Sequence, residues 1–262
     1  MQCGAFRVTY ASDERIFDTA TPIVALTALL AALAVVPLVS GTYWLDVLNR
    51  IGIAIIGAIG LNLLIGFTGQ ISIGHSAFLA VGAYATAILE SKAGVPFWAA
   101  IPLAAVVTSV FGLFFGVPSL RLKGLYLAIA TLAAHFITTY GIIHWERMTN
   151  GVLGFNVAPA TLFGVALDSD ARIFYLIYAL VVPAVWFARN LVRTRVGRAF
   201  IAVRDRDVAA EVIGVSVYRY KLLAFVISSF YAGVAGGLMA HHSRIVFPDA
   251  FSLDCHEQLW RR

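Results

Sequence analysis

Charged side chains are scarce in this chain: Asp, Glu, Lys and Arg make up 13% of its 262 residues, against roughly a quarter in an average soluble domain. Apolar residues make up 60%. A water-soluble fold of this length needs more polar groups to cover its surface, so the composition places the chain in a lipid bilayer. The net charge of +5 is then typical of basic cytoplasmic loops, and it does not indicate nucleic-acid binding.

Cysteine is nearly absent as well. Cys3 and Cys255 lie near opposite ends of the chain, and neither has a partner at metal-ligand spacing, so neither a disulfide framework nor a metal site is predicted.

The first twenty residues contain no apolar core and predict no cleavable signal peptide. The sequence also lacks P-loop, His-Glu-x-x-His, Gly-x-Ser-x-Gly and Gly-x-Gly-x-x-Gly motifs. We therefore expect no enzymatic activity and no cofactor in this chain.

Long apolar runs predict an all-α, polytopic transmembrane helical bundle with about seven spans. The ten-residue alternation of a membrane β-barrel is missing. One run, from Ile71 to Leu89, opens with polar and small residues, and it is either a full span or a re-entrant segment. The predicted runs are Pro22 to Val39, Val47 to Ile65, Ile71 to Leu89, Pro96 to Val117, Leu125 to Ile143, Ile173 to Ala188 and Leu222 to Ala240.

The positions of the basic residues predict an orientation. The stretch from Arg189 to Lys221 holds eight of the 19 Lys and Arg residues, so we expect it in the cytoplasm. If each predicted span crosses the membrane once, three further segments lie on the same side as this stretch: the Gly66 to Gln70 turn, the loop with Arg121 and Lys123, and the N-terminus. Twelve basic residues are then inside and five outside. The prediction is a multi-pass protein of the cytoplasmic (inner) membrane with a cytoplasmic N-terminus.

Acidic residues avoid the apolar runs altogether. All 14 lie outside them, and the ionisable side chains well inside them are His75 and His135. Proton-driven carriers usually keep an acidic or basic group within the membrane, because such a group is costly there and is retained for function. The distribution therefore argues that the energy for transport comes from another chain. Sodium coordination by carbonyls and hydroxyls at a broken helix stays open as an alternative.

Glycine and neutral polar residues are concentrated between Ile59 and Tyr84. Such a composition favours a break in a helix, where free backbone N–H and C=O groups can face a polar substrate. The same residues also suit close helix packing, with the polar side chains bonded to neighbouring carbonyls. Under the first interpretation, the candidate substrate-pathway residues are Asn62, Gly69, Gln70, Ser72, Gly74, His75 and Ser76.

The basic segment contains a second pattern. Residues Val196 to Gly214 predict a short helix-turn-helix with a helix end at Gly214. One interpretation is a solvated loop whose arginines fix topology and contact anionic lipid. Four apolar residues just before Gly214 favour instead a short amphipathic helix offered to a soluble partner.

Four blocks of sequence carry a family resemblance, and they cover roughly Leu45 to Phe251. The blocks are GLNLLIGFTGQISIGHSAFLAVGAYATAIL, LRLKGLYLAIATL, TNGVLGF and GRAFIAVRDRDVAAEVIGVSVYRYKLLAFVISSFYAGVAGGL. Together they are similar to the permease subunit of the branched-chain amino acid ABC transporters, in the relative with the longer N-terminus.

The resemblance implies an importer of branched-chain or related small amino acids built from several chains. A homologous second permease would complete the pore, two cytoplasmic ATPase subunits would bind ATP and Mg²⁺, and a periplasmic solute-binding protein would deliver the substrate. In such permeases a cytoplasmic Glu-Ala-Ala-x-x-x-Gly helix docks on the ATPase. Ala209, Ala210 and Gly214 match this motif, and Val208 replaces its Glu. The candidate coupling residues are Arg204, Asp205, Ala209, Ala210 and Gly214.

The predicted organisation has three parts: a cytoplasmic segment 1–20, a transmembrane permease domain 21–251 with its coupling segment 189–221, and a tail 252–262. The family continues here with apolar helices where this chain has SLDCHEQLWRR, so we expect a truncated or frameshifted reading frame. Rival functions are a urea or short-amide importer permease, a stand-alone channel or ion-coupled carrier, and, last, a membrane enzyme.

Overall fold

The computed structural model describes residues 20–119, 122, 124–157, 161–162, 165–166 and 169–251. The predicted N-terminal segment, apart from Ala20, lies outside the described residues. The tail 252–262 does so too, and with it the expected truncation.

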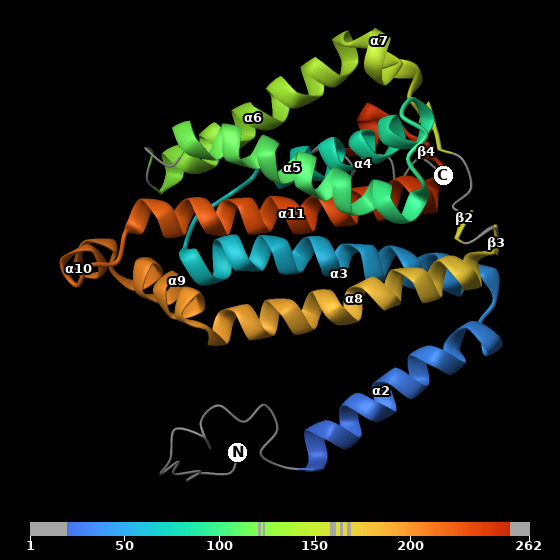
Figure 1. Ribbon diagram of the computed structural model, residues 1–262, viewed down its shortest axis with the longest axis horizontal. Helices are drawn as coiled ribbons and strands as arrows, with labels where there is room; N and C mark the ends of the chain where they lie inside the picture. Colours follow the sequence, from blue (N-terminus) through green and yellow to red (C-terminus); the bar gives the residue numbers. More distant parts are fainter. Residues whose placement is uncertain are drawn as a thin grey trace.

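Helices form at all seven predicted apolar runs, which confirms an all-α bundle (Figure 1). Among the described residues, five of these helices (α3, α5, α6, α8 and α11) are long and apolar enough to cross a membrane. The predicted count of seven spans is not confirmed, since α4 has 17 residues and a span needs about 20. The seven helices are α2 (Ala20–Val39), α3 (Thr42–Thr68), α4 (His75–Ser91), α5 (Phe97–Ser119), α6 (Leu125–His144), α8 (Asp170–Arg193) and α11 (Val217–Ser243).

Shorter elements connect these helices at the two ends of the bundle. At one end lie α9 (Arg195–Asp205) and α10 (Asp207–Val212). At the other end β1 (Phe155–Asn156) pairs antiparallel with β4 (Ile245–Val246). The remaining elements are α7 (Glu146–Thr149), η1 (Gly151–Leu153), η2 (Pro248–Phe251), and the antiparallel pair β2 (Thr161–Leu162) and β3 (Val165–Ala166).

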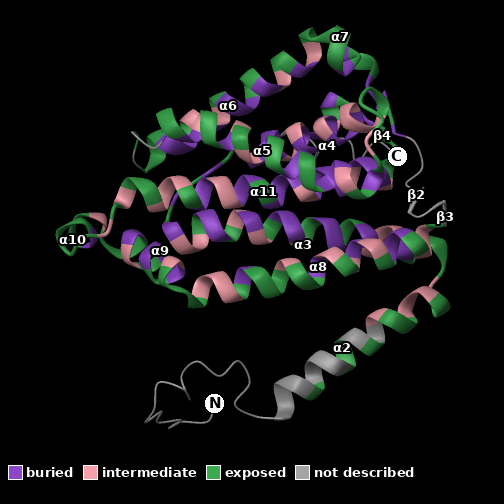
Figure 2. Cartoon of the chain, viewed as in Figure 1, coloured by how far each residue is buried: buried purple, intermediate pink, exposed green. Residues whose placement is uncertain are grey.

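The core lies around α11, which packs against α3, α4 and α5 (Figures 1 and 2). Glycine allows these helices to approach closely: a Cβ atom at Gly82 of α4 would lie 2.6 Å from the Cα of Gly233 in α11. At Gly236 a Cβ would collide with the backbone oxygen of Leu79. The bulky apolar side chains of the outer faces, such as Phe114 and Trp186, are exposed, as expected for surfaces in contact with lipid.

The chain between α3 and α4 crosses part of the bundle without helical structure. Gly69 ends α3 in a left-handed conformation with φ 68°, and α4 begins only at His75. The Ile73 N–H donates to Thr131 Oγ1 of α6, 3.1 Å away. Non-helical backbone is tolerated at membrane depth only where protein or a water-filled cavity satisfies it, and α6 provides part of that cover here.

The path of this segment answers the question of a re-entrant loop. The Gln70 side chain bonds the carbonyl of Lys221 near the start of α11, and Glu90 pairs with His241 near the end of α11. The chain from Gln70 to Glu90 therefore runs the length of α11 and does not return to the side it entered. The structure favours a discontinuous crossing, part extended chain and part helix, over a re-entrant segment.

Candidate functional site

The break between α3 and α4 buries most of the predicted pathway residues. Gln70, Ser72 and His75 are buried, while Gly69 is exposed. Gln70 Nε2 donates to Thr68 Oγ1 at 2.8 Å and to the Lys221 carbonyl at 3.1 Å. Within the described part of the chain, Gln70 Oε1, Ser72 Oγ and both ring nitrogens of His75 have no hydrogen-bond partner. An unsatisfied buried polar group costs about 1–3 kcal/mol, so this cluster is a candidate for function.

The start of α4 is joined to α6 by a second polar contact. Ser76 Oγ lies 3.1 Å from His135 Nδ1, and Gly74 lies directly against the backbone oxygen of Thr131. His135, which the sequence suggests only as an interior histidine, thus has a specific partner in α4. The structure brings Gln70, Ser72, Gly74, His75 and Ser76 into one stretch between α11 and α6.

Asn62 is separate from that stretch. Its side chain is exposed, and it lines a hollow of about 320 Å³ between α3 and α8, together with Arg189 and Arg193. The structure therefore does not bring Asn62 together with the other predicted pathway residues.

The predicted pathway and coupling residues meet at the α10 end of the bundle. The Arg204 guanidinium donates through Nη1 to the Gly66 carbonyl at 2.6 Å, near the end of α3. Lys221 Nζ lies 3.6 Å from Asp207 Oδ2. A polar cavity of about 250 Å³ lies here, and its lining includes Gly69, Gln70, Arg204, Asp205 and Lys221. A displacement of α9 would thus act directly on the α3–α4 break.

Helices α9 and α10 confirm the predicted helix-turn-helix. Ala210 is buried and Ala209 exposed, and Gly214 follows α10 with φ 89°. The apolar residues around them do not form a core: Val208, Val212 and Ile213 are 67%, 83% and 75% exposed. Helix α10 lies beyond the end of α11 (Figure 1), so these three side chains form an exposed apolar tip at this end of the protein. We call Val208, Val212 and Ile213 the α10 tip.

A polar cluster at the opposite end of the bundle was not predicted from the sequence. His241 and His242 lie at the end of α11 and pair with Glu90 and Asp46. A signal was present, because His241, Glu90 and Asp46 each stand one position outside a predicted apolar run. Such flanking positions meet at one end of a bundle: the C-terminal ends of the parallel helices α4 and α11 lie together there with the N-terminal end of the antiparallel helix α3.

Similarity to known proteins identifies the family of this chain. Residues 43–256 match the model described as branched-chain amino acid transport system / permease component. The chain belongs to this permease family. It is similar to the high-affinity branched-chain amino acid transport system permease protein LivM of Salmonella typhimurium and of Escherichia coli, each 33% identical in an alignment of 251 positions that covers 87% of this chain. It spans 59% of the length of either LivM protein.

A more distant relative is described as a "probable branched-chain amino acid transport permease protein LivH". It comes from Methanocaldococcus jannaschii and is 26% identical in an alignment of 200 positions that covers 72% of this chain and 62% of the relative. No solved structure matches the chain. This protein is therefore a multi-pass membrane protein of a transport permease family.

The Arg204 contact gives a first testable prediction. An Arg204→Ala variant loses the hydrogen bond to Gly66, and we expect the α3–α9 junction to be destabilised by roughly 1 kcal/mol. Hydrogen exchange of the amides between residues 66 and 70 should therefore accelerate. Arg198→Ala is the matched control, since among the described residues the exposed Arg198 side chain donates a hydrogen bond only within its own segment, to the Arg193 carbonyl at 3.4 Å. Equal exchange in the two variants would contradict a specific role for Arg204.

Proposed function

We propose that this permease is the membrane-spanning subunit of an ATP-driven importer for branched-chain or related small amino acids. The observation that carries the proposal is the α10 tip, whose three apolar side chains are exposed at the end of the bundle where Arg204 holds the α3–α4 break. Exposed apolar side chains beyond the membrane-spanning helices mark a site for a protein partner. A cytoplasmic ATPase subunit fits this site.

The orientation of the bundle agrees with this placement. The predicted alternation requires the Gly66–Gln70 turn, the loop before α6 and the basic segment to lie on one side, and Gly69, Leu122 and Arg204 indeed line one cavity. We propose that this end faces the cytoplasm of a cell with an inner membrane, and that the N-terminus lies on the same side. The basic residues of α9 then follow the positive-inside rule.

Coupling follows from the contacts at this end. Two ATPase subunits, which bind ATP and Mg²⁺, would engage this permease and a homologous second permease. Motion of α10 would pass through α9 and Arg204 to the α3–α4 break, and through Asp207 and Lys221 to α11. Both routes begin at the α10 tip, so one docking event reaches both elements.

The pathway residues suit a zwitterion. Gln70, Ser72, His75 and Ser76 supply hydrogen-bonding groups without acidic or permanently charged side chains, and a strong fixed charge would hold a zwitterionic solute too tightly for release. In the isolated subunit the groups of Gln70, Ser72 and His75 are buried. We propose that opening of the α3–α4 break exposes them to the solute delivered by a periplasmic solute-binding protein.

Uptake by vesicles tests the proposal. The chain is reconstituted with the second permease and the ATPase subunits, and labelled leucine and labelled urea are offered with the solute-binding protein. We expect leucine uptake that requires ATP and stops when the ATPase subunits are omitted. Leucine uptake without ATP would support a stand-alone carrier and contradict the proposal. ATP-dependent uptake of urea without uptake of leucine would support an ATP-driven importer but contradict the proposed amino-acid substrate.

A further inference from the structure

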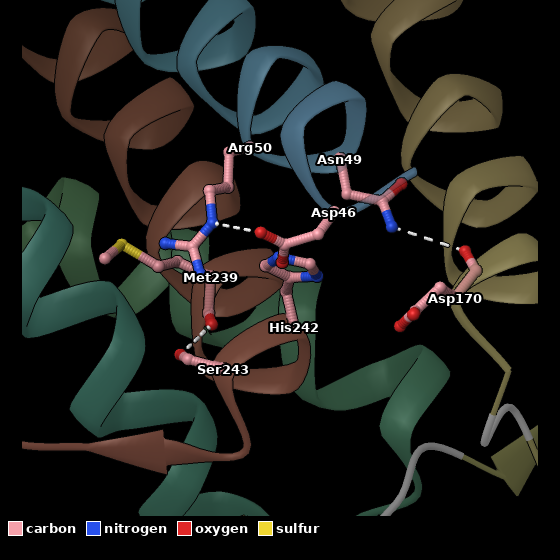
Figure 3. A network of polar contacts seen from close by, with 7 residues as sticks. All are labelled: Asp46, Asn49, Arg50, Asp170, Met239, His242 and Ser243. Atoms are coloured by element: carbon pink, nitrogen blue, oxygen red, sulfur yellow. Dashed lines mark hydrogen bonds and ion pairs between the residues drawn. The ribbon is translucent and has the colours of Figure 1, made fainter. Parts of the chain in front are cut away.

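Two adjacent histidines of α11 contact two different helices at the end of the bundle opposite α10. His241 Nε2 lies 2.8 Å from Glu90 Oε1 of α4, and His242 Nε2 lies 2.9 Å from Asp46 Oδ1 of α3. Both histidine side chains are nearly inaccessible, at 3% and 5% exposed. Figure 3 shows His242 directed toward Asp46, with Arg50 on the other side of the carboxylate. We call His241, His242, Glu90, Asp46 and Arg50 the histidine cluster.

The cluster is also attached to the two helices on its flanks. The His241 ring stands edge-on to Phe97, the first residue of α5, with ring centroids 4.6 Å apart. Asn49 Nδ2 donates to the backbone carbonyl of Asp170, the first residue of α8, at 3.3 Å (Figure 3). The end of α11 thus contacts α3, α4 and α5 directly, and α8 is attached through α3.

The two pairs differ in whether the carboxylate has a second partner besides the histidine. Glu90 is 13% exposed and has His241 as the ion-pair partner that the structure shows. Asp46 is 42% exposed, and Arg50 Nε lies 2.9 Å from its other oxygen. Removing one partner of a buried polar pair is destabilising, because the other group is then left without a partner away from water. Loss of His241 should therefore free α4 from α11 more completely than loss of His242 frees α3.

The same helix carries the coupling contacts at its other end. Helix α11 runs without interruption for 27 residues from Val217 to Ser243, a length of about 40 Å. Near its start, Lys221 pairs with Asp207 of α10 and its carbonyl accepts from Gln70. A single packed helix with fixed partners at both ends is a physical route for a displacement to travel across a membrane.

We propose that His241 and His242 are positioning residues that make the far ends of α4 and α3 follow α11 during transport. This inference rests on the proposed function. When the coupling segment moves α11, the paired carboxylates draw α4 and α3 with it, so the far side of the pathway responds to events at the α10 tip. The histidines act through Glu90 and Asp46, and contact with the solute is not required.

The test replaces His241 by Phe and by Gln in the assembled transporter. Phenylalanine keeps a ring beside Phe97 but has no ring nitrogen to pair with Glu90, whereas the Gln amide can place a polar nitrogen near the position of Nε2. Exchange of the α4 amides between residues 85 and 90 should become about tenfold faster in His241→Phe. The kcat of ATP-driven leucine uptake should fall about tenfold with KM unchanged, because solute binding is not altered. His241→Gln should restore most of both values.

Two further variants provide a control and a second test. His144→Phe is the matched control, since in the described part of the chain the exposed His144 hydrogen-bonds the Tyr140 carbonyl of its own helix and stacks on the Tyr140 ring, and it should leave both measurements unchanged. His242→Phe leaves Asp46 its Arg50 partner, so it should assemble normally and change exchange near residue 46 and uptake in the same direction, but less than His241→Phe.

The outcomes separate this inference from the proposed function. If the unmodified transporter shows no ATP-dependent uptake, both fail together. If it transports normally and His241→Phe changes neither exchange nor kcat, the inference alone is overturned. Faster exchange with an unchanged kcat would also overturn it, because the cluster would then be structural only. A loss that His241→Gln does not recover would overturn it as well, because a polar nitrogen paired with Glu90 would then not be what joins α11 to α4.

Discussion

A Gly236→Ala variant is expected to lose the folded bundle. A Cβ atom at position 236 would collide with the Leu79 backbone oxygen and lie 2.9 Å from the Ala83 nitrogen. Both neighbours are backbone atoms of α4, which cannot move aside as a flexible side chain can. Overpacking typically costs 1–3 kcal/mol, and we expect about 3 kcal/mol or more here because whole helices must separate. The measurement is the yield of monodisperse protein in detergent together with its thermal stability.

The matched control is Gly141→Ala in α6. Among the described residues, no neighbouring heavy atom lies within 4 Å of a Cβ at Gly141, and alanine favours a helix over glycine by about 1 kcal/mol. This variant should fold as well as the unmodified protein or slightly better. If the two substitutions lowered the yield equally, the close packing of α4 on α11 would not be what holds the core together.

A Gly214→Val variant should insert and fold but uncouple transport from ATP hydrolysis. Gly214 has φ 89°, and a Cβ atom added there would meet no atom of the described part of the chain within 4 Å. The cost is therefore backbone strain of about 1–3 kcal/mol, which is relieved by a turn of different geometry after α10. The α10 tip then no longer fits its partner. We expect solute-stimulated ATPase activity and uptake to fall about tenfold, the change that corresponds to about 1.4 kcal/mol of coupling.

Gly94→Val provides the comparison for this second prediction. Gly94 has φ 63° and equally open surroundings, but it lies between α4 and α5 at the end opposite α10. The backbone strain is of the same kind, whereas the ATPase does not reach this position in the proposed orientation. Stimulated ATPase activity should stay normal in Gly94→Val. A normal ATPase response in Gly214→Val, or an equal loss in both variants, would count against α10 as the coupling helix.

Local signals were sufficient for the helices and for the coupling segment. The apolar runs predicted helices at all seven positions, and Gly214 ends a helix-turn-helix as its sequence indicated. These features depend on residues near one another in the chain, which is why sequence alone predicts them.

Contacts between segments that are distant in the sequence could not be predicted in this way. The glycine and polar residues from Ile59 to Tyr84 allowed both a pathway and simple helix packing, and composition could not choose between them. The structure separates Asn62 from the rest and buries Gln70, Ser72 and His75. It also pairs His135 with Ser76. Each result depends on which face of α6 and α11 lies against the break, and no local pattern specifies that.

The sequence by itself determined a helical membrane protein of the branched-chain amino acid permease family, with a basic segment that ends in an amphipathic helix. Only the tertiary structure decided that the chain from Gln70 to Glu90 crosses as extended chain and helix, and that Arg204 contacts the break. It alone showed His241 and His242 joined to α4 and α3. The physical reason is that hydropathy and turn chemistry act over a few residues. Pairing between helices is set by glycine contacts such as Gly82 with Gly233, more than a hundred residues apart.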